Sequence, residues 1–549
     1  MENKFYNKSY NKFLIFILFF VIGLTIYDDY GFNIDEKFHR SNGFYWLNYI
    51  AEFFNLEQLA HLSKEKLINI KGFTLSPIEH FNKYAIIFDV PAAIIEVLFR
   101  LELPIDYYQM RHFLVFFYFY VGLIFFYKIL FNRFKKDSLA LIGVVLLFLT
   151  PRILGDSFQN LKDIVFLTFV IITSFWYFKT IDNFNKRNII LFSLFSAISI
   201  SIRMFAVFFP ISFIIFCLLS LKNESYKKKI NHIVFHVITC VIFLILIWPL
   251  LWENTLESFL SYFEILGQYF GAKVLFLNNY YNSSALPYSY MPIWIFISTP
   301  ILHLIIFFLG FSIMSARFFG RFINIKSNQI YNDFWRSTNE KKDFFILFNF
   351  IAIFLGIIFL NIKLYNSWRI AYFLYFFIIY IGIFYINIIL IKLKNINLLY
   401  NFILKFIFFL FMLLTAIRIV IYHPYQSLYF NMFTPNKIKN SVEVDYTGLS
   451  AIRFLNDIVV ENPNKSVIKI GVASWYPLSR MIELLDSKDI SKIEIVSNKK
   501  NSSSDYIYTI GISEVDKNLY KKYDIPINFT KHKELVIDGV IIYEVYKKK

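Results

Sequence analysis

The chain has 549 residues, of which 57% are hydrophobic and only 17% are charged, and its formal net charge is +17. A soluble protein carries charge on about a quarter of its residues, so this composition excludes an ordinary soluble protein. The basic excess accompanies no basic reading helix and no base-stacking platform, and we expect no nucleic-acid partner. Membrane proteins collect Lys and Arg in their cytoplasmic loops, which accounts for the sign of the charge. The composition predicts a multi-pass membrane protein.

Apolar stretches recur along the chain at lengths that cross a hydrocarbon core of about 30 Å as helices. The first follows a basic start and has no small-residue cleavage site after it, so we expect an uncleaved span and not a signal peptide. Hydropathy predicts about eleven membrane-spanning helices in all. They are expected near residues 13–27, 111–131, 137–151, 163–179, 188–202, 204–220, 231–250, 292–314, 343–361, 369–390 and 402–421.

Alternate loops between these spans differ in charge. With the N-terminus in the cytoplasm, the inner loops carry basic runs such as NRFKK (132–136) and YKKK (226–229), whereas the short outer connections carry few basic residues. This bias predicts a cytoplasmic N-terminus. Spans 188–202 and 204–220 form either a tight outer hairpin around Arg203 or one broken helix.

Two long segments then fall on the outer side. Within the membrane domain, residues 1–423, the first loop covers residues 28–110. Its amphipathic stretch YWLNYIAEFFNLEQLAHL (45–62) favours helices that lie on the membrane face. Residues 424–549 form a polar tail, in which we expect a small extracytoplasmic α/β domain.

Short β-type runs and turn signals support the prediction for the tail. KELVIDGVIIYEVYK favours a hairpin with Asp-Gly at its turn. Strands are expected at 466–472, 492–497 and 505–510, and a helix at 479–485.

Ionisable and aromatic residues gather in the segments expected outside. DYGFNIDEKFHR (29–40) contains Asp35, Glu36 and His39. Because ionisable groups near a bilayer are costly and usually line a cavity or a path, their gathering at one face predicts a pocket at the outer membrane surface. Further candidates follow along the chain: Arg152, Lys162, Asp163, Arg203, Trp252, Tyr365, Arg369 and His423.

The residue types of this predicted pocket indicate its chemistry. Carboxylates act as general bases or metal ligands. Cations bind phosphate, and Arg does so with two parallel hydrogen bonds. Tyr and Trp offer flat faces with a polar edge that suit sugars. Outside the cytoplasm there are no nucleotide sugars and no ATP, so the combination favours transfer from a membrane-borne, phosphate-linked lipid donor.

Several segments resemble, in the same order, stretches of the protein O-mannosyltransferase superfamily (glycosyltransferase family 39, GT-C fold), particularly of its bacterial members. The resemblance covers about residues 28–450. It is carried by the first-loop Asp-Glu with His39, PRILGDSFQNLKD, SIRMFAV, WPLLWEN, LYNSWRIAYFLY and HPYQSLYFN…VDYTG.

The resemblance implies a polytopic GT-C glycosyltransferase. The enzyme would move a sugar from a polyprenyl phosphate to an acceptor hydroxyl or amine, with inversion, at the outer face of a bacterial inner membrane, in cell-envelope assembly. The acceptor is a lipid, glycan or protein. Relatives differ in their use of a divalent metal, which is left unassigned. The chain departs from many bacterial relatives at Asn366–Ser367, where they have Asp-Gly, and this leaves the donor sugar open.

The same resemblance implies roles for the candidate residues. Asp35 is the base that deprotonates the acceptor, Glu36 belongs to the same catalytic motif, and Asp163 positions the sugar or acceptor. The donor phosphate is bound by Arg203, Lys162, Arg369 and Arg152, and the substrates contact His39, Trp252, Tyr365 and His423.

Two other functions stay open. A transporter or flippase for lipid-linked sugars predicts ionisable residues at mid-membrane and an internal repeat. Neither is evident in the sequence. A non-catalytic scaffold for envelope assembly has no need of intact Asp35, Asp163 and Arg203.

Overall fold

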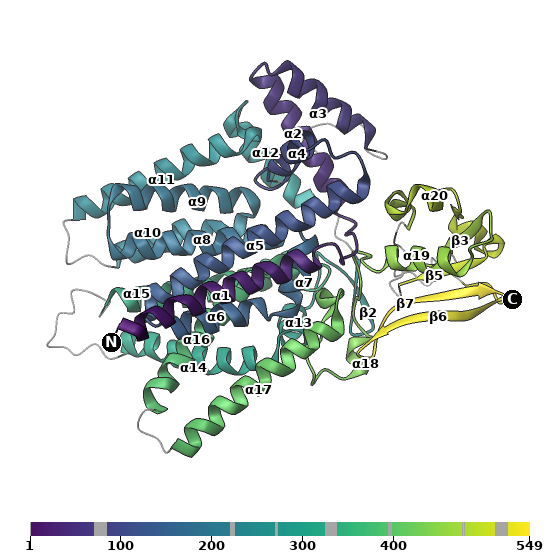
Figure 1. Ribbon diagram of the computed structural model, residues 1–549. Coiled ribbons are helices and arrows are strands. Elements are labelled where there is room, and N and C mark those ends of the chain that lie inside the picture. The colour runs from purple at the N-terminus through teal and green to yellow at the C-terminus, as the bar shows by residue number, and fades with distance from the viewer. Residues whose placement is uncertain are drawn as a thin grey trace.

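The computed structural model is a bundle of long helices with a small β-sheet at one end (Figure 1). The helices of the bundle carry most of the apolar residues, in keeping with the predicted polytopic membrane protein. The structure describes residues 2–70, 85–219, 226–268, 273–323, 337–393, 398–474, 476, 478–510 and 525–549.

The bundle begins with α1, and its long helices run back and forth (Figure 1). Local sequence sets several of their ends: Pro104 starts α5, and the Ser337 side chain caps α15 by accepting from Glu340 N–H. The bundle helices are α1 (Glu2–Ile26), α5 (Pro104–Phe134), α6 (Asp137–Phe148), α7 (Pro151–Gln159), α8 (Asp163–Asp182), α9 (Lys186–Ile202), α10 (Phe208–Leu218), α11 (Tyr226–Ile247), α13 (Tyr290–Ser298), α14 (Ile301–Ile323), α15 (Thr338–Phe359), α16 (Leu374–Lys392) and α17 (Leu398–Tyr422).

Within the described ranges, seven helices are long and apolar enough to cross a membrane, or eight if α6 and α7, bent by 66°, form one span. The predicted count of about eleven is therefore not confirmed. The first predicted span is apolar only over Lys12–Ile26, and the sixth corresponds to the short segment Met204–Leu218, with residue 220 outside the described residues. The segment 292–314 is divided between α13 and α14, where Pro300 interrupts the helix.

Helix burial separates the centre of the bundle from its surface. In α8, 89% of the span is buried, and α16 is also mostly buried, whereas only 11% of the span in α11 and 6% of that in α17 are buried. Apolar side chains that stay exposed along whole helices suit contact with lipid. The loops that join the helices lie at the two ends of the bundle (Figure 1).

At Arg203 the chain passes between two separate helices. Helix α9 ends at Ile202, Arg203 has an extended backbone, and the 3-10 turn η2 (Met204–Val207) leads into α10. This arrangement corresponds to the predicted hairpin and not to one broken helix.

Contacts between distant loops define two ends of the bundle. At the first, which we name the Asp35 end, Asn33 Nδ2 donates to Gln159 Oε1 at 2.6 Å and Ile34 N–H donates to Thr447 O at 3.1 Å. At the second, the Asp343 end, Arg133 pairs with Asp343. The candidate residues of the sequence analysis lie in the loops and in the adjoining helix ends of the Asp35 end.

The first loop forms a helical cap beside the Asp35 end (Figure 1). Helix α2 packs on α3 and α4, and the apolar side chains of this cap also contact the segment that follows α11. Residues 71–84 of the predicted loop lie outside the described residues. The cap consists of α2 (Glu36–Phe53), α3 (Glu57–Asn69), α4 (Asp89–Leu98), η3 (Pro249–Leu251) and α12 (Thr255–Gln268).

The C-terminal segment contains a five-stranded sheet in the order β4-β3-β5-β7-β6. Strand β3 pairs in parallel with β4 and β5, and β7 pairs antiparallel with β5 and β6. The predicted helix at 479–485 is a 3-10 segment, η7 (Leu478–Leu484). The strands are β3 (Ile468–Val472), β4 (Ile493–Ile495), β5 (Tyr506–Thr509), β6 (Phe529–Ile537) and β7 (Val540–Lys548), with helices α19 (Ala451–Glu461) and α20 (Ser487–Ile490).

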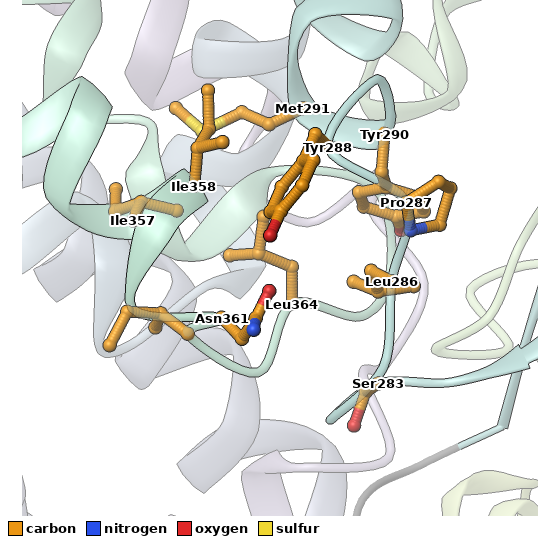
Figure 2. A pocket seen from close by; sticks show the side chains of 11 residues that line it. Ser283, Leu286, Pro287, Tyr288, Tyr290, Met291, Ile357, Ile358, Asn361 and Leu364 are labelled. Carbon is orange, nitrogen blue, oxygen red and sulfur yellow. The ribbon is translucent and has the colours of Figure 1, made fainter.

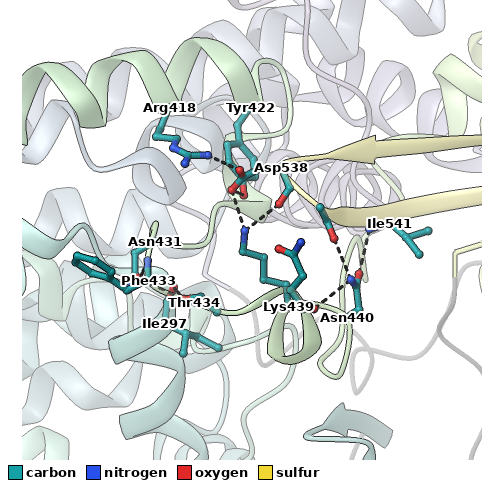
Figure 3. A network of polar contacts seen from close by, with 12 residues as sticks. Ile297, Arg418, Tyr422, Asn431, Phe433, Thr434, Lys439, Asn440, Asp538 and Ile541 are labelled. Atoms are coloured by element: carbon teal, nitrogen blue, oxygen red, sulfur yellow. Dashed lines mark hydrogen bonds and ion pairs between the residues drawn. The ribbon is translucent and has the colours of Figure 1, made fainter.

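The predicted Asp-Gly turn joins the sheet to the bundle (Figure 3). Asp538 and Gly539 both have positive φ, as a tight hairpin turn requires. The Asp538 carboxylate accepts from Arg418, from Tyr422 OH at 3.0 Å and from Lys439 Nζ at 3.0 Å. This network links the end of α17 and the short helix α18 (Asn436–Lys439) to the hairpin.

Candidate active site

Asp35 lies at the Asp35 end, just before α2, and forms an ion pair with Arg369. Arg369 Nη2 donates to Asp35 Oδ2 at 2.7 Å. The Asp35 side chain is 42% exposed, whereas Arg369 is 7% exposed. The carboxylate therefore keeps an accessible side while its charge is fixed against a buried guanidinium.

The surroundings of Asp35 favour its ionised form. Burial raises the pKa of Asp35, but the Arg369 guanidinium, His39 and Lys162 together outweigh this effect and hold the pKa below its ordinary value. Tyr365 lies beside the same cation, with its ring centroid 5.1 Å from the Arg369 guanidinium carbon. Asp35 is accordingly ionised at neutral pH, as a general base must be.

A second ion pair stands where α8 begins. Arg203 Nε donates to Asp163 Oδ1 at 2.9 Å. Asn160 ties the preceding turn to this carboxylate, because its Oδ1 accepts from Asp163 N–H at 2.9 Å and its Nδ2 donates to Asp163 Oδ2 at 3.2 Å. Part of the charge of Arg203 is thus neutralised by Asp163.

Lys162 lies between the two ion pairs. With His39, Phe88 and Asp89 it lines a small pocket. Burial, followed by the nearby charge of Arg203, lowers the pKa of Lys162 to about 7. This amine is therefore close to its titration point at neutral pH, and an anionic ligand would favour its charged form.

His39 is oriented by Asp89, a residue of the same first loop. His39 Nδ1 lies 3.0 Å from Asp89 Oδ2, and Asn42 Nδ2 donates to the same oxygen at 2.5 Å. Asp89 begins α4, so this contact also fixes the cap against α2.

Glu36 is turned away from Asp35, into the protein. It is buried, accepts from Asn33 N–H at 2.8 Å, and lies 3.1 Å from His112 Nε2. Its contacts are those of a residue that fixes the first loop to α5. Of these two adjacent carboxylates, Asp35 is the half-exposed one.

Three further candidate residues make their described contacts away from Asp35. Arg152 donates to Tyr429 O at 2.9 Å and to Ser367 Oγ at 3.2 Å. Trp252 Nε1 donates to Ile245 O at 3.0 Å, within the aromatic cluster of the cap. His423 Nε2 lies 2.9 Å from Asp29 Oδ2, at the junction with the tail.

Sequence reasoning missed a buried charge cluster between α2, α4 and α5. Glu96 Oε1 accepts from Arg40 Nη2 at 2.6 Å, and Glu96 Oε2 accepts from Arg111 Nη1 at 2.7 Å. Fully buried charges need partners, and here two cations share one carboxylate. The signal was a lone Glu in the apolar run VPAAIIEVLF, a position where an unpaired charge is too costly to bury.

A separate pocket lies between residues 283–291 and the end of α15 (Figure 2). Tyr288 and Asn361 supply polar groups to a lining that is otherwise mainly apolar, and no charged side chain lines it. It therefore lacks the cations expected of a phosphate site. Over the described parts of the chain, no three His, Cys, Asp or Glu side chains are grouped to hold a metal ion.

Comparison with known proteins supports the family suggested by the motifs. Residues 108–252, about a quarter of the chain, match the model of the family described as dolichyl-phosphate-mannose-protein mannosyltransferase. The matched segment contains Arg152, Lys162, Asp163 and Arg203. No curated protein matches the chain. The match confirms the predicted resemblance over this segment, and for a chain with several apolar helices it indicates a membrane glycosyltransferase of the GT-C type.

Proposed function

We propose that the protein transfers a sugar from a polyprenyl-phosphate donor to an acceptor hydroxyl or amine at the outer face of a membrane, with Asp35 as the general base. The observation that carries the proposal is the half-exposed carboxylate of Asp35, fixed by Arg369, beside Lys162. The family match supports a lipid-linked donor, since the family description names dolichyl-phosphate-mannose.

In the proposed reaction, the oxygen or nitrogen of the acceptor group attacks the anomeric carbon of the sugar. Asp35 takes up the proton that this hydroxyl or amine loses. The bond between that carbon and the phosphate oxygen breaks, and the polyprenyl phosphate leaves with the electron pair. Attack opposite the leaving phosphate inverts the anomeric centre. Cations placed at the developing phosphate charge lower the barrier.

Among the candidate cations, Lys162 and Arg203 are the ones that we assign to the phosphate. Both lie beside Asp163 at the start of α8, and neutral Lys162 would take up a proton as the phosphate enters. Arg369 faces Asp35, so its first role is to keep the base ionised. We assign Asp163 to positioning Arg203.

The basic runs at the Asp343 end support placing the Asp35 end on the outer side. NRFKK (132–136) covers the end of α5 and the link to α6, and Lys186 and Arg187 begin α9. Lys and Arg favour the cytoplasmic side of a membrane. The C-terminal sheet, which contacts the Asp35 end, is then extracytoplasmic, and we propose a bacterial inner membrane as the location.

The test is transfer from a panel of radiolabelled polyprenyl-phosphate sugars by the purified protein, with Asp35→Asn as the paired variant. We expect transfer, or slow hydrolysis of the donor, by the wild type and its loss in the variant. Transfer retained by Asp35→Asn would contradict the assignment of the base and leave the enzyme class standing.

A transporter for lipid-linked sugars is the alternative that the same assay separates. It would bind the donors without breaking the sugar–phosphate bond, and would move them between leaflets of a reconstituted vesicle. Donor binding without any turnover or movement would favour the scaffold.

A further inference from the structure

The loop that leads to Arg369 contains two consecutive left-handed residues. Asn366 has φ of 53° and Ser367 has φ of 60°. A Cβ disfavours this conformation, and Asn tolerates it better than Ser. The turn at Ser367 therefore depends on contacts with its surroundings.

Glu443 supplies the contact at the backbone of this turn. Ser367 N–H donates to Glu443 Oε1 at 2.6 Å. The Tyr290 hydroxyl lies 2.7 Å from the same oxygen and 3.2 Å from Ser367 O. Glu443 is 4% exposed, and its own N–H donates to Leu275 O at 3.0 Å, so the backbone at residue 443 is held in place as well. Hydrogen bonds to a carboxylate in such a site are strong and directional.

Only Trp368 separates this turn from Arg369, whose Nη2 donates to Asp35 at 2.7 Å. A 3-10 turn, η4 (Arg369–Ala371), follows directly. Asp35 lies 334 positions away in the sequence, and the guanidinium reaches it from the segment that directly follows the turn at Ser367.

We propose that Glu443 is a positioning residue of the sugar transfer: by holding the left-handed turn at Asn366–Ser367, it places Arg369 beside Asp35. The inference rests on the proposed function for the role of Asp35 as base. The geometric part of it, the dependence of the Asp35–Arg369 pair on Glu443, has a readout that needs no turnover.

Asp35 and Glu443 both have cationic neighbours. Asp35 faces Arg369, His39 and Lys162. Glu443 faces Arg369 and Arg152 in addition to the Tyr290 hydroxyl. Burial raises the pKa of Glu443 to about 7, although the Ser367 N–H and Tyr290 bonds act against this. Near neutral pH, Glu443 is therefore partly protonated, so a neutral side chain at this position resembles a form that the protein already adopts.

The experiment measures the pKa of Asp35 through its reactivity. Carbodiimide activates the protonated carboxyl, and an added amine then marks Asp35, which is quantified by mass spectrometry of the peptide as a function of pH. Arg369→Gln gives the reference for a lost ion pair, and we expect it to raise the midpoint of labelling by about one pH unit or more. Glu443→Ala should produce at least half of that shift, and kcat/KM with the donor should fall about tenfold.

Two further variants separate positioning from a general structural role. Glu443→Gln keeps an acceptor oxygen and should restore most of the wild-type midpoint. Ser367→Gly adopts positive φ without support. The double variant Glu443→Ala/Ser367→Gly should therefore recover at least half of the shift. Glu461→Ala, on the exposed face of α19, is the matched control and should leave the midpoint and the rate unchanged.

A wild-type midpoint in folded Glu443→Ala would overturn the inference, and so would a shift that Ser367→Gly does not reduce. If Glu443→Ala fails to fold, Tyr290→Phe is measured in its place. A midpoint unchanged in Tyr290→Phe while Glu443→Ala/Ser367→Gly also stays unfolded would assign Glu443 a structural role only. A silent wild type in the transfer assay, with the labelling shifts as expected, would reject the proposed function and keep the positioning contact.

Discussion

The two ends of the bundle each contain a carboxylate paired with an arginine, and they differ in what the pair leaves accessible. At the Asp343 end, Arg133 donates to both carboxylate oxygens at 2.7 and 2.5 Å, and Tyr380 OH adds a bond of 2.9 Å. Asp343 is 7% exposed. At the Asp35 end, Arg369 donates one bond and Asp35 is 42% exposed.

In our proposal, this difference separates a structural ion pair from a catalytic one. Asp343 has its lone pairs occupied by donors from α5 and α16, so it ties helices together and offers little to a ligand. Asp35 is kept ionised by its neighbours while one side stays open to an acceptor. The same residue types thus serve packing at one end and, in our proposal, catalysis at the other.

Removing the carboxylate charge should lower the transfer rate at the Asp35 end and the stability at the Asp343 end. The effect on the rate is the largest that we expect. Asp35→Asn should lower kcat/KM for sugar transfer by about a hundredfold to ten-thousandfold, because the general base is lost. Its loss of thermal stability in detergent should be smaller than that of Asp343→Asn, because position 35 is half exposed and the charge of Asp163 still acts on Arg369. Equal losses of stability in Asp35→Asn and Asp343→Asn would remove the distinction between the two ends.

Asp343→Asn should act on stability instead. Truncating one partner of a buried ion pair leaves Arg133 without a counter-charge, which costs about 3 kcal/mol. Unfolding in a graded series of denaturing detergent measures this loss. The fraction that stays folded should transfer sugar at the wild-type rate, and a lower specific rate would mean that the Asp343 end also serves the reaction.

Arg369→Gln tests the Asp35–Arg369 pair and leaves the Arg133–Asp343 pair intact. The low pKa of Asp35 means that the base is active above that pKa and is lost as the pH falls through it. Without the guanidinium, this acid limb of kcat/KM should move upward by about one unit. The pH–rate profile between about pH 4 and 7 measures the shift. An unmoved limb would show that Arg369 does not set the ionisation of the base.

Lys162 gives a smaller effect on the alkaline side. Because burial lowers its pKa to about 7, Lys162 is charged below that pH and neutral above it. If the donor phosphate binds the charged amine, the donor Kd should rise by up to about tenfold from pH 7 to pH 8. Lys162→Met should bind more weakly and lose this pH dependence. A Kd that is flat in the wild type would remove Lys162 from the phosphate site.

The smallest effect is expected at the junction with the C-terminal sheet. Asp538 accepts from Arg418, Tyr422 and Lys439 (Figure 3). Asp538→Asn should loosen this contact and make the tail a few times more sensitive to limited proteolysis, while the transfer rate changes less than twofold. Unchanged proteolysis would show that other contacts hold the sheet to the bundle.

The sequence alone determined the class of protein and the segments that carry its chemistry. Hydropathy and charge predicted the multi-pass helices, although the count of eleven spans is not confirmed, because the apolar parts of α1, α6 and α10 are short. The Asp-Gly hairpin and the helix start at Ser337 also follow from residues within a few positions of one another. These features depend on local backbone preferences and on burial in lipid, which a linear pattern records.

Only the tertiary structure decided which of the two adjacent carboxylates stays accessible. Asp35 and Glu36 are adjacent and chemically alike, yet one pairs with Arg369 and stays half exposed while the other is buried against His112. Likewise, nothing near Ser367 in the sequence indicates that Glu443 holds its turn. Such pairs are set by how helices pack over distances of tens to hundreds of residues, where the burial of each charge depends on a partner that the local sequence does not contain.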